Sequence, residues 1–181
     1  MKDSIQICGE TFNKKRIHFS FESSYKQIDK MNELKKLQQL AKLETVSLNG
    51  TNINDEDLRH LSACTTLSNI NLSFTPISDK GIAYLVILKQ LKHLRLKETE
   101  ITQKSLSYFN KMTALVSLQV HETEISGKDM AGLDLASLEE LFVDCDDEED
   151  HNTLLALSSR LPSCDIIAKG KGVYNNGVFE A

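Results

Sequence analysis

Leucines return at a constant interval along most of this chain. Leu43, Leu67, Leu91 and Leu115 are evenly spaced, and Leu138 follows at an interval only one position shorter. A period between about 20 and 29 residues is typical of a solenoid, in which one short supersecondary unit is stacked on copies of itself. Because a single unit of this length cannot bury its own apolar side, the leucines predict stacked coils with one continuous interior.

Each unit begins with a strand pattern. The motif is L-x-x-[VIL]-x-[LV]-x-x-T-x-I, which appears in one unit as Leu67, Ile70, Leu72, Thr75 and Ile77. Apolar and polar residues alternate in its middle, which predicts a short strand with one face buried and the other in solvent. We expect the threonine hydroxyl to bond to the backbone at the bend after each strand, at Thr51, Thr75, Thr99 and Thr123.

The second half of each unit has the pattern of a helix. A residue whose side-chain oxygen can cap a helix follows each isoleucine, namely Asn54, Ser78, Thr102 and Ser126. Apolar pairs three positions apart come next: Leu58/Leu61, Ile82/Leu85, Leu106/Phe109 and Met130/Leu133. This step places both members of a pair on one helix face, so we expect strand and helix to enclose a shared core.

The extended motif L-x-x-L-x-L-x-x-T-x-I-[ST]-D-x-G-[LI]-x-x-L is best preserved at residues 67–85. It resembles the 24-residue leucine-rich repeats frequent in bacterial proteins, which are similar to the ribonuclease-inhibitor type, although Gln103 and Gly127 replace its aspartate in two units. The resemblance implies an α/β solenoid, a right-handed β-α superhelix with a parallel sheet on the concave face and helices on the convex face. It implies no substrate, because such arrays serve chiefly as binding scaffolds.

We expect a single domain over residues 1–181 with atypical ends, because an open solenoid exposes apolar faces that terminal units must cover. Residues 1–42 are predicted to form an N-terminal cap and a divergent first repeat. Residues 43–137 would form four regular repeats, and residues 138–181 the last repeat and a C-terminal cap with a hairpin.

The N-terminal end predicts two strands and a helix. The stretches SIQICGETF and RIHFSF each alternate like one strand, joined through NKK, and apolar residues then recur every third position, at Ile28, Met31, Leu34, Leu37 and Leu40. At the other end we expect a helix around Thr153–Arg160 that stops before Pro162, a strand over CDIIA, and a hairpin turning at Asn176-Gly177.

The composition narrows the classes of partner. The formal net charge of −5 gives no gain from counterion release, so we expect no nucleic-acid partner. No segment approaches the roughly 18 apolar residues of a membrane span, and the first residues lack the apolar run of a signal peptide. We therefore expect no membrane partner and a cytoplasmic protein, or one exported without such a signal. The four cysteines form no C-x-x-C pair, which favours reduced thiols.

The outward strand positions form three columns across the predicted sheet. The first column is Thr45, Asn69, His93, Ser117 and Glu140, the second is Ser47, Asn71, Arg95, Gln119 and Phe142, and the third is Asn49, Ser73, Lys97, His121 and Asp144. Phe74, Glu98 and Glu122 flank the third column as a rim. The third unit carries a basic trio of His93, Arg95 and Lys97, whereas the first two units carry small uncharged groups and the fifth carries acids with Phe142.

This uneven distribution predicts a partner site in the middle of the sheet. Its residues are Asn69, Asn71, Phe74, His93, Arg95, Lys97, Gln119, His121, Phe142 and Asp144. We expect Arg95 and Phe142 to anchor it, because interface hot spots favour arginine and aromatic residues. The alternative is that these are ordinary exposed side chains. The acidic run DCDDEED at residues 144–150 is typical of a solvated loop, or alternatively of a field that steers a basic partner.

These patterns favour a non-catalytic module that binds another protein through the concave sheet and its rim. A bacterial immunity protein that occludes a toxin fits this description, and so does an effector that engages a host protein. The alternative is a hydrolase or metalloprotein using His93, His121 and Cys145. The chain has no P-loop, G-x-S-x-G or H-E-x-x-H motif, and these residues lack metal-ligand spacing, so we expect no catalytic residue, metal or cofactor.

Overall fold

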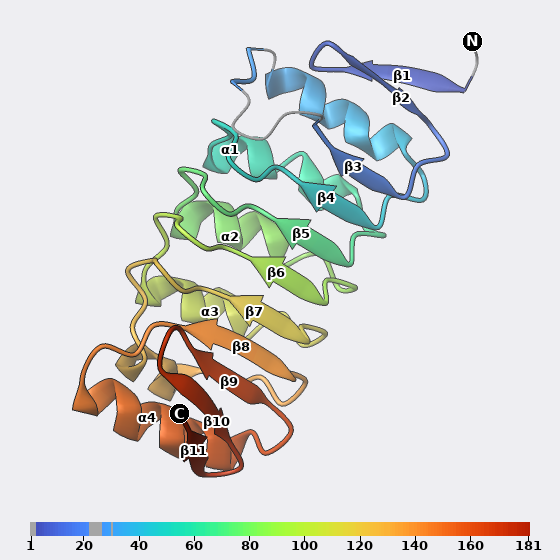
Figure 1. The fold of residues 1–181 in the computed structure, drawn as a ribbon. Helices are drawn as coiled ribbons and strands as arrows, with labels where there is room; N and C mark the ends of the chain where they lie inside the picture. Colours follow the sequence, from blue (N-terminus) through green and yellow to red (C-terminus); the bar gives the residue numbers. More distant parts are fainter. Residues whose placement is uncertain (1–2, 22–26, 30) are drawn as a thin grey trace.

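Strands and short helices alternate along the chain, as the repeat predicts. The structure is a computed structural model that describes residues 3–21, 27–29 and 31–181. Its strands lie side by side along the length of the molecule, and the helices line the opposite side (Figure 1). The N-terminus and the C-terminus lie at opposite ends of this array (Figure 1).

One sheet runs through all the repeats, with its strands in the order β11-β10-β9-β8-β7-β6-β5-β4-β3. The strands β3 to β9 are parallel, and β10 and β11 are antiparallel to their neighbours. Their bounds are β3 His18–Ser20, β4 Thr45–Ser47, β5 Asn69–Asn71, β6 His93–Arg95, β7 Ser117–Gln119, β8 Glu140–Val143, β9 Asp165–Ala168, β10 Gly172–Asn175 and β11 Val178–Glu180. The predicted parallel sheet is therefore confirmed.

The helices of the coils are short. They are α1 (Asp55–Leu58), α2 (Asp79–Leu85), α3 (Leu106–Phe109) and α4 (Glu148–Arg160), with 3₁₀ helices η1 (Met31–Gln39), η2 (Leu61–Ala63), η3 (Gln103–Ser105) and η4 (Lys128–Gly132). The repeating leucines Leu43, Leu67, Leu91, Leu115 and Leu138 are at most 1% exposed. All eight residues of the predicted helix pairs are buried with them, so the shared core between strand and helix is confirmed.

The recurrent threonines close the bend after each strand, as predicted. Each hydroxyl donates to the carbonyl three residues earlier, at 2.6 Å for Thr51, 2.5 Å for Thr75, 2.7 Å for Thr99 and 2.6 Å for Thr123. Each of these bonds gives a carbonyl at the bend a hydroxyl donor beside the core, where an unpaired carbonyl is costly. These threonines therefore have a structural role.

Three of the four predicted helix caps are confirmed. The side chains of Asn54, Ser78 and Thr102 accept from the backbone N–H groups two residues later. The prediction is wrong for Ser126, whose hydroxyl instead donates to Asp129 Oδ2 at 2.9 Å. In that unit the backbone N–H of Lys128, two residues after Ser126, donates instead to Asp150 of the next coil at 2.7 Å.

The motif aspartate ties neighbouring coils together. Asp55 accepts from the N–H and the hydroxyl of Ser78 at 2.8 and 2.6 Å. The motif glycine permits this contact, since a Cβ on Gly81 would lie 2.5 Å from Asp55 Oδ1. One coil later, Asp79 accepts from the N–H and hydroxyl of Thr102, both at 2.8 Å, and from the Ser105 hydroxyl at 2.5 Å.

The N-terminal end departs from the prediction. The expected single strand over residues 4–12 is wrong, because the chain turns at Cys8 and Gly9, both with positive φ, and forms the hairpin of β1 (Ser4–Ile7) and β2 (Glu10–Asn13). The NKK stretch consequently leads from this hairpin to β3 in the main sheet. The predicted helix is the 3₁₀ helix η1, whose three residues per turn match the three-residue spacing of buried Leu34 and Leu37. The side chain of Met31 lies outside the described part of the chain.

The C-terminal end contains the predicted helix, strand and hairpin. Asn176 and Gly177 have positive φ and connect β10 to β11, and the Gly177 N–H donates to the Ser158 hydroxyl at 3.0 Å. The helix α4 begins at Glu148, earlier than expected, because Asp147 caps it by accepting from the Asp150 N–H at 2.9 Å. The favoured interpretation of residues 144–150 as a solvated loop therefore holds for only part of the run: residues 145–147 lie outside helix and strand and Asp146 and Asp147 are exposed, whereas residues 148–150 belong to α4. The last three residues of the run, Glu148, Glu149 and Asp150, form the first turn of α4, where acidic groups complement the positive end of the helix dipole.

We predict that Asp79→Ala lowers the free energy of unfolding by about 3 kcal/mol, since three donors on the next coil lose a charged acceptor. Gln103→Ala is the matched control, because Gln103 occupies the same repeat position one unit later and is exposed. Its effect should stay within about 0.5 kcal/mol. Urea unfolding of both variants measures the difference, and equal losses would show that the inter-coil bond contributes little.

Candidate interaction surface on the sheet

The outward strand residues line up as predicted. Thr45 pairs with Asn69, Asn69 with His93, His93 with Ser117 and Ser117 with Glu140, and the second column follows the same register. We call the surface formed by the outward residues of β3 to β11 the sheet face. Two of its residues are buried rather than exposed, which corrects the expectation for Ser73 and Ser117. The Ser117 hydroxyl donates to Oε2 of Glu140, its neighbour in the first column, at 2.7 Å.

The sheet face extends beyond the five predicted units. Ile167 pairs with Phe142 and with Val173, which adds two apolar residues to the second column. Lys169 follows β9 directly and continues the third column after Asp144. The sequence reasoning missed these residues although it predicted the CDIIA strand. Alignment of Asp165 with Glu140 would have revealed them, but the interval there exceeds the regular one because α4 is longer than the other helices.

The rim residues share a bend of the backbone. Phe74, Glu98 and Glu122 have φ values of 59°, 51° and 59°, and Gly50 takes the same position in the first regular unit with 66°. This left-handed conformation costs a non-glycine residue roughly 1 kcal/mol. It is supported by the neighbouring coil, as where the Phe74 N–H donates to the Lys97 carbonyl at 2.8 Å.

The bend brings Lys97 into an ion-paired cluster. Its ammonium lies 3.1 Å from Glu122, 3.8 Å from Glu98 and 4.9 Å from the centre of the Phe74 ring. Lys169 also pairs with Glu122. The predicted basic trio is therefore not a single positive patch, because the charge of Lys97 is balanced by carboxylates on its own rim.

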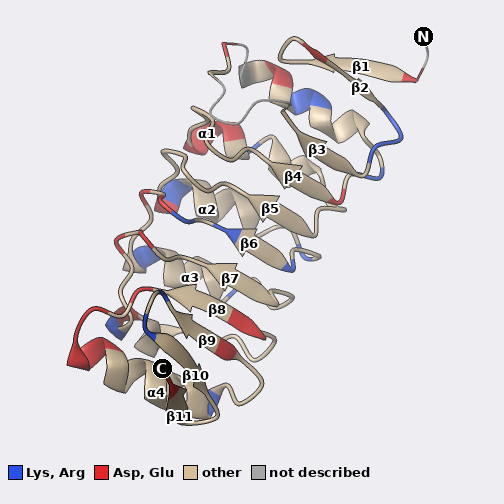
Figure 2. Ribbon diagram, viewed as in Figure 1, with Lys and Arg blue, Asp and Glu red and all other residues tan. Residues whose placement is uncertain are grey.

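Arg95, by contrast, is exposed at the centre of the sheet face. The structure gives its guanidinium no ion pair or hydrogen bond within the described ranges. Its partners in the second column are the uncharged Asn71 and Gln119. Figure 2 shows Lys and Arg colouring at β6, whereas β5 and β7 beside it carry no charge. A hollow of about 390 Å³ adjoins it, lined by His18, Thr45, Val46, Ser47, Asn69, Ile70, Asn71, His93 and Arg95.

The C-terminal part of the sheet face carries an apolar row bordered by acids. Phe142, Ile167 and Val173 form a row across three strands, and Val178 is 58% exposed on β11. Acids border this row on the first column, where Glu140 and Asp165 accept from Ser117 and Asn175 respectively. The structure therefore places the two predicted anchors, Arg95 and Phe142, in chemically different halves of one surface.

His121 and Asp144 lie between these halves, beside the ion-paired cluster. Burial lowers the pKa of His121 below its ordinary value of 6.5; Asp144 opposes this shift, and Lys97 and Lys169 add to it. Burial also raises the pKa of Asp144, whose carboxylate accepts from the Glu122 N–H. The Nδ1 atom of His121 is buried and has no hydrogen-bond partner among the described residues, while its ring lies 5.9 Å from that of Phe142.

Comparison with known proteins agrees with this architecture. A family model described as a leucine-rich repeat matches residues 63–86, which is one unit of the array. An internalin C2 from Listeria monocytogenes superposes with a TM-score of 0.59 at 17% identity, over 88% of this chain and 75% of that one. A leucine-rich-repeat protein from Leptospira interrogans gives 0.53 at 18% identity, over 76% and 33% of the two chains.

The protein has the leucine-rich-repeat fold. No curated protein matches the sequence significantly. The two structural likenesses concern the fold, and the bacterial subtype of the repeat stays a prediction. None of the helices in the described part of the chain has the length and apolarity needed to cross a bilayer.

The residues of the alternative enzymatic hypothesis do not meet in this fold. His93 and His121 lie on different columns of the sheet face, whereas Cys145 is buried. The Cys145 thiol instead lies 3.4 Å from the buried Tyr174 hydroxyl, which bonds to His151 Nδ1 at 2.8 Å. Across residues 3–21, 27–29 and 31–181, no three His, Cys, Asp or Glu side chains are placed to hold a metal ion. The geometry gives this hypothesis no support.

All four cysteines are free, as expected. Burial raises the pKa of Cys64 to about 11 and that of Cys164 to about 12. Such thiols are poor nucleophiles at neutral pH, because the thiolate is the reactive form. Cys64 and Cys164 therefore act as small apolar core residues.

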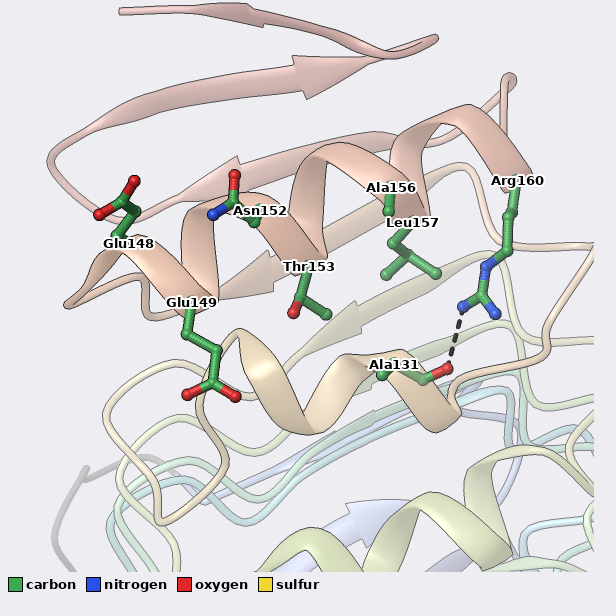
Figure 3. A pocket seen from close by; sticks show the side chains of 8 residues that line it. All are labelled: Ala131, Glu148, Glu149, Asn152, Thr153, Ala156, Leu157 and Arg160. Atoms are coloured by element: carbon green, nitrogen blue, oxygen red, sulfur yellow. Dashed lines mark hydrogen bonds between the residues drawn. The ribbon is translucent and has the colours of Figure 1, made fainter.

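A second hollow lies on the helix side, between η4 and α4. Its volume is about 590 Å³, and Figure 3 shows the α4 side chains Glu149, Thr153, Leu157 and Arg160 directed toward η4. The Arg160 guanidinium already donates to the carbonyls of Ala131 and Leu133, both at 3.2 Å. The Arg160 guanidinium therefore joins α4 to the η4 region and is not available to a ligand in this hollow. For this reason we assign the candidate site to the sheet face.

We predict that His121→Gln makes stability less sensitive to acid. The lowered pKa means that the unfolded chain binds a proton on His121 more readily than the folded chain does, so the free energy of unfolding falls as pH drops below about 6.5. The variant should lose less stability than the unmodified protein between pH 7.5 and pH 5.5 in urea unfolding. Parallel curves for the two proteins would contradict this assignment.

Proposed function

We propose that this protein is a non-catalytic module that binds a protein partner through the sheet face and the adjoining rim. The observation that carries the proposal is the solvent-exposed Arg95, which has no ion pair among the described residues and stands between uncharged strands. An unpaired arginine is available for a bidentate bond to a partner carboxylate. The apolar row of Phe142, Ile167 and Val173 adds the kind of surface that supplies most interface energy.

The structure of the sheet face supports this role for a physical reason. The inward strand residues form the core, the threonines close the bend within each coil, and Asp55 bonds to the next coil, whereas the Arg95 side chain has none of these roles. Position 95 can therefore carry a side chain that serves binding without lowering the free energy of unfolding.

The proposal includes two possible biological roles for this binding module. An immunity protein that occludes a toxin and an effector that engages a host protein would both use such a surface, and we keep the expectation of a cytoplasmic location. The identity of the captured partner separates the two roles. A toxin from the same cell supports the first role, and a protein of a host supports the second.

We predict that Arg95→Glu and Phe142→Ser each weaken binding of the native partner at least tenfold, which corresponds to about 1.4 kcal/mol. The partner would be captured from the source cell on the immobilised protein, identified, produced separately and titrated by calorimetry. Lys80→Glu is the matched control, since it makes the same kind of charge reversal on exposed α2. Unchanged affinity of both sheet-face variants would place the site elsewhere.

A further inference from the structure

We propose that the partner segment carries a carboxylate and an apolar side chain at a fixed separation, with the carboxylate on Arg95 and the apolar group on Phe142 and Ile167. This inference rests on the proposed function and specifies what the sheet face recognises. It follows from the order of charges and apolar groups across the strands.

The surroundings of Arg95 select the charge of the partner group. The guanidinium presents paired donors that match a carboxylate, and the Asn71 and Gln119 amides beside it can donate to the remaining lone pairs. A group with more negative charge would require further free cations. Lys97 and Lys169, however, are both paired with Glu122. The site therefore suits an Asp or Glu side chain of a protein.

The spacing of the strands sets the separation of the two partner groups. Arg95 on β6 is two strands from Phe142 on β8 and three strands from Ile167 on β9, all in the same column. Neighbouring strands lie about 4.8 Å apart, so the two anchor points are about 10 to 14 Å apart across the sheet. A helix covers about 10.5 Å in seven residues, and an extended segment covers about 10 Å in three. The partner segment crosses the strands.

The acids beside the apolar row set the direction of the partner segment. Glu140 and Asp165 border this row, so a partner carboxylate placed at that end would meet like charge. Reversed binding is therefore disfavoured, since juxtaposed like charges oppose a wrong orientation. The segment consequently runs with its acid over β6 and its apolar residue over β8 and β9.

Selection from a displayed library of random 16-residue peptides tests the inference. The immobilised full chain is the target in one selection, and Arg95→Glu is the target in a parallel one. Peptides enriched on the unmodified protein should carry Asp or Glu three or seven residues from Leu, Ile, Phe or Met. Those enriched on Arg95→Glu should carry Lys or Arg at the acidic position.

The best peptide is then synthesised and titrated by fluorescence anisotropy. Arg95→Glu and Phe142→Ser should each weaken it at least tenfold, and Lys80→Glu should leave it unchanged. Replacing the peptide acid with lysine should restore binding to Arg95→Glu. Circular dichroism of each variant, including that of half-buried Phe142, checks that the fold is intact.

The contrary outcomes are distinguishable. Peptides that depend on Phe142 but not on Arg95, or that are basic at the predicted acidic position, would overturn this inference and leave the proposed function standing. Peptides that bind both variants unchanged would place recognition away from the sheet face and contradict the proposed function as well. Enrichment of no peptide above uncoated resin would also count against the inference, because the library contains segments of the required chemistry.

Discussion

Burial of apolar side chains between neighbouring coils underlies every other feature of this molecule. A single coil has one apolar side, formed by residues such as Leu94, Leu96 and Leu106, and can remove it from water only against the coils before and after it. The sheet follows from this, because stacking copies in one register places their strands side by side and parallel. The ends of the array cannot obey the same rule, so they have different structures. The hairpin of β1 and β2 lies at one end, and the hairpin of β10 and β11 at the other.

Polar residues add hydrogen bonds that hold each bend and align neighbouring coils on the leucine core. The threonine hydroxyls satisfy carbonyls at the bend, and Asp55 and Asp79 reach across to the next coil. Where the aspartate is missing, at Gln103 and Gly127, the chain uses another solution for the fourth coil. Asp150 comes from the following coil and accepts the Lys128 N–H, and Gly127 is needed there because a Cβ would lie 2.8 Å from that of Asp150. The acidic run therefore has a structural function that its composition concealed.

Most outward side chains of the sheet contribute neither to the core nor to the hydrogen bonds between coils. Their arrangement is ordered across the strands, from amides through Arg95 to the apolar row at Phe142 and Ile167. Between them, the network of Lys97, Glu122 and Lys169 neutralises its own charge. The exposed positive charge of the central sheet is thereby concentrated on Arg95, and this concentration is the basis of the proposed recognition of a partner carboxylate.

The repeat, the parallel sheet, the threonine bends, three of the helix caps and the columns of the sheet face were all predictable from the amino-acid sequence, because each depends on residues within one unit or at a fixed interval. Which charges in those columns remain free depends instead on how the coils meet in space. Lys97 follows β6 and Lys169 follows β9, with β7 and β8 between these strands in the sheet, yet both lysines contact Glu122, and no local pattern encodes that meeting. The turn at Cys8 and Gly9 and the start of α4 at Glu148 likewise depend on the folded ends of the array, since the end units have no neighbour on one side to repeat the regular interval.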